Sequence, residues 1–116
     1  MDFDYSVVVP SHNRRDVLFE VLSALDAQRD APEFEVVVVD DGSSDGTPER
    51  LREWRGTRPF TALLQEPRGP AAARNRGVAA ARGRRVAFLG DDTVPEPGWL
   101  AAHAAALDDF QLTALA

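Results

Sequence analysis

Short apolar runs alternate along the chain with longer stretches in which apolar residues recur at helical spacing. Each run is about five residues long, and three of the four are followed at once by a proline, an acidic pair or a glycine. The runs occupy residues 5–9, 35–39, 60–64 and 85–89. Short, largely β-branched runs bounded by turn residues predict strands that are buried on both faces of a sheet.

The stretches between these runs predict helices. Residues 17–25 place five apolar side chains on one face of a helix. A second helix is expected to begin at Thr47, with the threonine capping it and Pro48 in its first turn. The alanine-rich stretch 71–81 can pack closely on a sheet, and 99–107 predicts a last helix.

The alternation of strand and helix predicts an α/β fold, with a mostly parallel, Rossmann-like sheet and helices on both faces. Residues 1–116 have the size of one domain. After Asp108 and Asp109, residues 110–116 have the composition of another strand. A sheet that ends there has an uncovered apolar edge. We therefore expect the fold to be incomplete at its C-terminus, or this edge to be covered by something else.

Ligands of open parallel sheets bind outside the carboxyl ends of the strands. The polar clusters of this chain follow the predicted strands, at 10–14, 40–47, 66–76 and 90–93. We expect these four loops to converge on one edge of the sheet. The third loop carries arginines and leads into a helix start, where a diphosphate can also meet backbone N–H groups.

Two of these loops carry adjacent aspartates, which repel each other unless a ligand or hydrogen bonds stabilise them. Asp91 and Asp92, with no cysteine nearby, suit a hard cation such as Mg²⁺ or Mn²⁺. A cation bound to a diphosphate neutralises the charge of that leaving group. Asp41, which follows Asp40 in a tight turn, can accept hydrogen bonds from a nucleobase or from ribose hydroxyls.

Each acidic motif is also typical of an ordinary turn when it is taken alone. Their joint position at the correct ends of four strands is what favours a binding site. His12 is most simply interpreted as a solvent-exposed residue rather than a ligand.

Composition narrows the classes of function. The formal net charge of −6 argues against a general nucleic-acid binder. All 13 basic residues are arginines, which excludes Schiff-base lysines and phosphate-loop lysines. There is no cysteine, so disulfides and thiolate zinc sites are also excluded. No apolar run has the roughly 20 residues that cross a bilayer.

Four segments in order resemble the amino-terminal half of family 2 glycosyltransferases, which have the GT-A fold. The resemblance covers nearly the whole chain and is strong because all four motifs occur with the family's spacing. The matching segments are VVVPSHNR at 7–14, VVDDGSSDGT at 38–47, GPAAARNRG at 69–77 and FLGDD at 88–92, followed by PEPGWL at 95–100.

The resemblance implies a role for each matching residue. Asp41 would contact the base with the Pro10 backbone nearby, and Asp91 would lie near the ribose or the sugar. Asp92 would bind the divalent metal, Mn²⁺ or Mg²⁺, that bridges the diphosphate, and Arg74 would contact a phosphate or the sugar. Gly90 is a departure, because the family often has an aspartate at this position of its DxD motif.

The resemblance also implies the activity, which is metal-assisted transfer of a sugar, with inversion, from a nucleoside diphosphate sugar to an unknown acceptor. The donor is a UDP-sugar by default, and the acceptor is a saccharide, a lipid or a protein. No residue matches the family's catalytic base, so the catalytic residue is unassigned. The family also implies a cytoplasmic location, with peripheral membrane association left open for the intact protein.

One alternative remains beside this interpretation, and two other α/β classes fit the sequence less well. The chain could be a catalytically silent module that binds a nucleotide sugar or a protein partner. A dinucleotide-binding domain would need a glycine-rich turn where Pro10 to Asn13 stand. A phosphoacceptor receiver domain, which also places acidic residues at strand ends, would need a lysine that this chain lacks.

Overall fold

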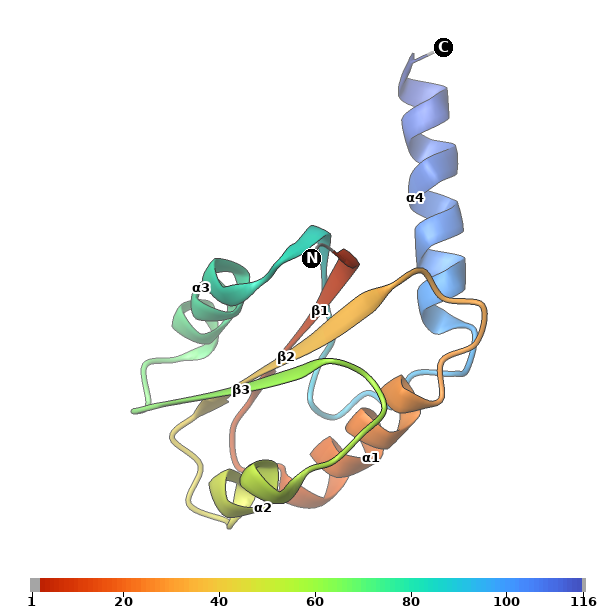
Figure 1. Ribbon diagram of the computed structural model, residues 1–116. Helices are drawn as coiled ribbons and strands as arrows, with labels where there is room; N and C mark the ends of the chain where they lie inside the picture. The colour runs from red at the N-terminus through yellow and green to blue at the C-terminus, as the bar shows by residue number, and fades with distance from the viewer. Residues whose placement is uncertain (1–2, 116) are drawn as a thin grey trace.

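The computed structural model describes the backbone of residues 3–115 and the side chains of residues 3–107. Strands and helices alternate along the whole chain, as predicted (Figure 1). The elements are β1 (Phe3–Ser11), α1 (Arg15–Asp26), β2 (Phe34–Asp41), α2 (Thr47–Glu53), β3 (Phe60–Gln65), α3 (Pro70–Ala80), β4 (Gly83–Phe88) and α4 (Trp99–Leu115).

The four strands form one parallel sheet in the order β3-β2-β1-β4. The first strand is therefore central, and the chain adds β2 and β3 on one side of it before crossing to the other side with β4. This reversal of direction between β1 and β4 is the topological switch point at which parallel α/β sheets bind ligands.

Helices cover both faces of the sheet (Figure 1). On one face, residues of α1, α2 and α4 pack on odd-numbered residues of β1 such as Val7 and Val9, with Leu18 and Leu100 fully buried. On the other face, α3 packs on Val8 and its neighbours in β2. Because β1 and β2 are covered from both sides, each needs the continuous apolar run that predicted it.

The two outer strands differ from the prediction of burial on both faces. All six residues of β3 are only partly buried, and Phe88 at the end of β4 is 49% exposed. Both strands lie at the edges of the sheet, and α3 packs over β1 and β2 rather than over β4. The predicted burial is therefore correct for the central pair and wrong for the edge strands.

Two predicted details of the helices are wrong. The helix after β2 begins at Thr47, but its N-cap is Gly46 in a left-handed conformation with φ 91°. Thr47 donates its hydroxyl and its backbone N–H to Asp45, which does the capping work assigned to the threonine. In place of the strand expected at 110–116, residues 110–115 are the end of α4, because no proline or glycine interrupts the helix-forming sequence between Trp99 and Leu115, and residue 116 lies outside the described residues.

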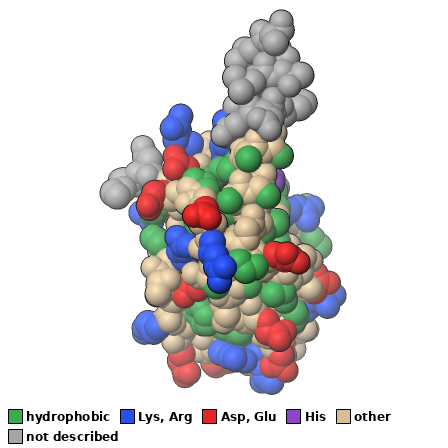
Figure 2. Space-filling model, turned by 90° about the vertical axis from the view of Figure 1, so that its right-hand side faces the viewer, with side chains coloured by type: hydrophobic (Ala, Val, Ile, Leu, Met, Phe, Trp, Pro, Cys, Tyr) green, Lys and Arg blue, Asp and Glu red, His purple; other side chains and the backbone are tan. Residues whose placement is uncertain are grey.

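The face of the molecule that Figure 2 shows carries no large patch of side chains with the same charge. Among its described residues, acidic and arginine side chains are interspersed over this face (Figure 2). No described helix is both long enough and apolar enough to cross a bilayer.

Close packing of α3 on the sheet depends on Gly77. A Cβ at this position would overlap Val8 Cγ1 and lie 3.3 Å from Val39 Cγ2. Both valines are fully buried in the centre of the sheet, so neither has free space to move into. A glycine inside a helix costs up to about 1 kcal/mol relative to alanine, and here it allows the helix to approach the strands closely.

We predict that Gly77→Ala lowers the free energy of unfolding by about 1–2 kcal/mol, because the overlap outweighs the gain in helix propensity. Urea denaturation followed by circular dichroism measures the change. Gly98→Ala is the matched control, since a Cβ there has no atom within 4 Å. A Gly77→Ala variant as stable as the control would contradict this account of α3 packing.

Candidate functional site

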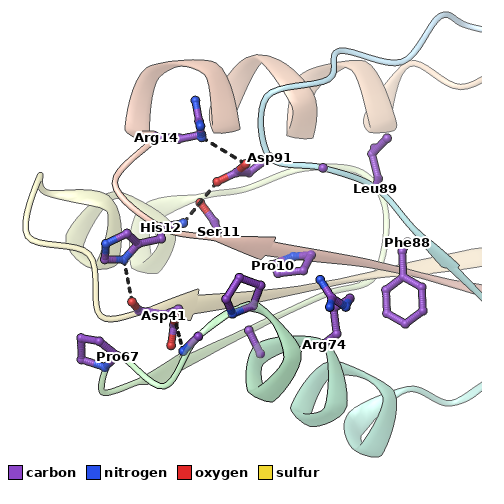
Figure 3. A pocket seen from close by; sticks show the side chains of 14 residues that line it. Pro10, Ser11, His12, Arg14, Asp41, Pro67, Arg74, Phe88, Leu89 and Asp91 are labelled. Carbon is purple, nitrogen blue, oxygen red and sulfur yellow. Dashed lines mark hydrogen bonds and ion pairs between the residues drawn. The ribbon is translucent and has the colours of Figure 1, made fainter.

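A pocket of about 700 Å³ opens at the carboxyl ends of the strands (Figure 3). All four predicted loops contribute to it, as the alternating order of elements implied. Its walls include the end of β1 through Arg14, Asp41 at the end of β2, the segment from Pro67 into α3, and the end of β4 through Asp91. Four of the five residues predicted for the site line the pocket, namely Pro10, Asp41, Arg74 and Asp91. Asp92 is not among the lining residues.

Asp41 is held in one orientation by three hydrogen bonds. Its Oδ1 accepts a bond from Gln65 Nε2 at 2.8 Å and another from the Arg68 N–H at 2.8 Å. Its Oδ2 accepts one from the Gly69 N–H at 3.0 Å. Gly69 can place its N–H there because it adopts φ 99°, which L-residues rarely adopt.

These bonds change the acidity of the carboxyl group. The Gln65 side chain, followed by the Arg68 N–H, lowers the pKa of Asp41, and this effect exceeds the opposing effect of burial. Asp41 is therefore a fixed anion at neutral pH, with unused acceptor capacity on the pocket wall. An N–H group of a ligand is the natural partner for such an oxygen.

The neighbouring Asp40 has a different task. It is fully buried, and its two oxygens accept bonds from the Ser43 N–H at 3.1 Å and the Ser43 hydroxyl at 2.5 Å. These bonds close the turn that follows β2. The adjacent aspartates thus divide between the two predicted interpretations, with Asp40 as a turn residue and Asp41 as a pocket residue.

The loop after β4 presents the second acidic pair. Asp91 is 15% exposed, and its Oδ2 accepts a hydrogen bond from the His12 N–H at 3.2 Å. Asp92 is 55% exposed, and its Oδ1 lies 3.4 Å from the Thr93 hydroxyl. The pair therefore has one carboxylate inside the pocket and one on the solvent side of its rim.

The acidic pair suits a hard divalent cation in the manner of sites that also use substrate oxygens. Within the described residues, no group of three or more histidine, aspartate or glutamate side chains converges. A cation here would therefore have at most these two carboxylates and would complete its shell with water or phosphate oxygens. A Cβ on Gly90 would lie 3.2 Å from Asp92 Oδ1, so the glycine leaves open the space beside that oxygen.

His12 is exposed, as predicted, but its ring lines the pocket. Its Nδ1 lies 2.7 Å from the Asp41 carbonyl oxygen, which can only accept, so Nδ1 carries the proton. The Asn13 side-chain amide lies 3.3 Å from the other ring nitrogen. Together these contacts fix the ring across the gap between the loops after β1 and β2 (Figure 3).

Two further pocket residues were missed by the sequence interpretation. Ser11 is 3% exposed, and among the described residues its hydroxyl has no hydrogen-bond partner. A buried hydroxyl needs a partner, which a bound ligand or water can supply. Arg14 also lines the pocket. Both residues lie inside the motif at 7–14, but nothing in their spacing distinguishes them from loop residues.

The three arginines near the start of α3 separate in space. Arg74 lines the pocket, and among the described residues it makes no ion pair, which leaves its guanidinium available (Figure 3). Arg76 turns away and donates to the Leu64 carbonyl at 2.8 Å. Arg68 contributes its backbone N–H to Asp41 rather than its side chain to the pocket.

A parallel sheet with a pocket at its switch point, lined by charged as well as apolar side chains, places the chain in the Rossmann-like class of α/β folds. The chain belongs to glycosyl transferase family 2, whose family model matches residues 6–115.

The chain is similar to a validoxylamine A glucosyltransferase of Streptomyces hygroscopicus subsp. limoneus, with 41% identity over 106 residues that cover 85% of this chain and 23% of that protein. Among solved structures it is similar to residues 1–349 of S. aureus TarS in complex with UDP-GlcNAc, with a TM-score of 0.80 and 34% identity, covering 91% of this chain and 31% of that one.

A mannosyltransferase of Pyrobaculum calidifontis in complex with GDP-Man and Mn²⁺ is also similar, with a TM-score of 0.73 and 34% identity, covering 82% of this chain and 29% of that one. These similarities confirm the GT-A assignment of the fold. The chain spans between about a quarter and a third of the length of these matched chains.

We predict that Asp41→Asn lowers the free energy of unfolding at pH 7 by about 1–3 kcal/mol, because bonds to a charged acceptor are lost. The pKa of Asp41 is lower in the folded state than the unfolded value of about 3.9. Its stabilising contribution is therefore complete above pH of about 4 and is lost as the pH falls through the lowered value.

Urea denaturation at several pH values tests this dependence. The difference between the wild type and Asp41→Asn should be largest near pH 7 and should shrink below pH of about 4. Asp16→Asn, at a side chain that is 83% exposed, is the control and should change stability by about 0.5 kcal/mol or less. A difference for Asp41→Asn that stays constant with pH would show that its charge is not what stabilises the loop.

Proposed function

We propose that the pocket binds a nucleoside diphosphate sugar and that the whole protein transfers the sugar to an acceptor. The observation that carries this proposal is the fixed Asp41 carboxylate, which lines one pocket together with Arg74 and Asp91. A hydrogen-bonding anion suits a nucleobase, and an unpaired guanidinium suits a phosphate. Both groups line the same pocket, as a ligand with a base at one end and phosphates at the other would require.

The base subsite lies at the ends of β1 and β2. Asp41 would accept a ring N–H of the base, and the Pro10 backbone and the His12 ring would border it. The solved relatives carry UDP-GlcNAc in one case and GDP-Man in another. Uracil and guanine both have a ring N–H that a carboxylate can accept, so Asp41 does not by itself distinguish the two bases. UDP-sugar is our default donor.

The diphosphate subsite lies between α3 and the loop after β4. Arg74 would pair with a phosphate oxygen, and Asp91 would lie near the ribose or the sugar. Asp92 would hold a divalent cation, Mn²⁺ or Mg²⁺, and the Mn²⁺ in the mannosyltransferase complex supports this assignment. When bound, the cation neutralises charge that develops on the departing diphosphate.

Inverting transfer needs a carboxylate that takes the proton of the acceptor hydroxyl as the nucleotide leaves. Asp41 is engaged by three hydrogen bonds, and Asp91 is held by the His12 N–H and by Arg14. We therefore assign the described carboxylates to donor binding and leave the catalytic base unassigned. Donor binding is therefore the step that can be tested on this chain.

We predict that the chain binds UDP in calorimetric titration, and that Mn²⁺ raises the affinity by a factor on the order of ten. Asp92→Ala should lose most of this enhancement while retaining metal-independent binding, because its carboxylate lies outside the pocket wall. Asp16→Ala, which removes an exposed carboxylate of α1, is the control. Absence of binding by UDP, GDP and dTDP at millimolar concentration would contradict the proposed donor site.

A further inference from the structure

Arg14 links the loop that follows β1 to the loop that follows β4. It occupies the N-cap position of α1, and its side chain reaches the loop that follows β4 (Figure 3). Its Nε lies 3.4 Å from Asp91 Oδ1, and its Nη1 lies 3.9 Å from Asp92 Oδ2. One guanidinium therefore faces both carboxylates of the acidic pair.

The ion pair is loose. Both distances exceed the roughly 2.7–2.9 Å of a well-formed charge-assisted hydrogen bond. The Arg14 side chain is 52% exposed, so water can replace the carboxylates at little cost. The helix does not depend on the side chain, because the N-cap contact is made by the Arg14 carbonyl, which accepts from the Leu18 N–H at 2.9 Å. The guanidinium is thus free to move without disturbing α1.

A divalent cation at the acidic pair would compete with Arg14 for the same oxygens. Two positive groups beside one carboxylate repel each other, so binding of the metal must displace the guanidinium or share the carboxylates with it. Arg14 also lines the pocket, where a diphosphate would offer it new acceptors. A planar guanidinium is well suited to phosphate oxygens.

We infer that Arg14 is an internal counter-cation, which offsets part of the negative charge of Asp91 and Asp92 before a ligand binds and passes to the diphosphate when the metal and the nucleotide bind. Arg14 would then oppose binding of metal alone and favour binding of metal with nucleotide. This coupling would keep the acidic pair from retaining a cation without its substrate. The inference rests on the proposed function, since it takes the nucleoside diphosphate as the ligand.

The test uses binding rather than activity. Free Mn²⁺ is measured by electron paramagnetic resonance as it is titrated into the wild type, first without nucleotide. We expect Arg14→Gln to lower the dissociation constant of Mn²⁺ about two- to fivefold, the range for half-exposed ion pairs. With saturating Mn²⁺, the same substitution should weaken UDP binding, measured by calorimetry, by a similar factor.

Opposite changes in the two affinities distinguish this role from a structural one, which would weaken both. Arg15→Gln is the matched control, because it removes the same charge at the next position. Arg15 pairs with Asp16 and with the Asp45 carbonyl, and not with the acidic pair. Arg14→Lys keeps the charge and should restore Mn²⁺ affinity toward that of the wild type.

An Mn²⁺ affinity in Arg14→Gln that equals that of the wild type or of Arg15→Gln overturns the inference, as does failure of every variant to bind Mn²⁺. Failure of the proposed function has a different outcome. In that case UDP would bind to no variant, while the shift of Mn²⁺ affinity in the absence of nucleotide would persist.

Discussion

The parallel pairing of β1 with a strand on each side is the constraint on which the site depends. Because β1 is central, the loop that follows it lies between the loops that follow β2 and β4. His12 uses this position twice, since its ring contacts the Asp41 carbonyl and its N–H contacts Asp91. Asp41 and Asp91 therefore lie on opposite sides of the loop that follows β1, and both contact His12.

The tightly packed apolar residues lie at the centre of the sheet, and the pocket residues lie at the strand ends, where this packing stops. The fully buried valines of β1 and β2 give way at the strand ends to Ser11 and Asp41, which line the pocket. Asp41 is held by hydrogen bonds, whereas Asp92 is exposed and its ion-pair partner is the half-exposed side chain of Arg14. The proposed base end of the site is thus preorganised, and the proposed phosphate end has side chains that can rearrange.

Most of the fold could be predicted from the sequence because its information is local. A strand covered on both faces must be continuously apolar, so β1 and β2 are evident from composition. The partial exposure of β3 and β4 could not be predicted in this way, because it depends on which strands lie at the edges of the sheet. The pocket positions of Asp41 and Asp91 followed from strand order. The turn role of Asp40 and the orientation of Arg14 depend on contacts between distant loops, which no local pattern encodes.

On the proposed function, one nucleoside diphosphate spans the pocket from Asp41 to the acidic pair. Amide spectra of the ¹⁵N-labelled chain, recorded with UDP and then with trace Mn²⁺, test it most directly. We expect UDP-induced shifts at Arg68 and Gly69, and paramagnetic broadening centred on residues 90–93 and 11–14. Broadening centred on the opposite edge of the sheet, near Asp4 and Arg84, would contradict it.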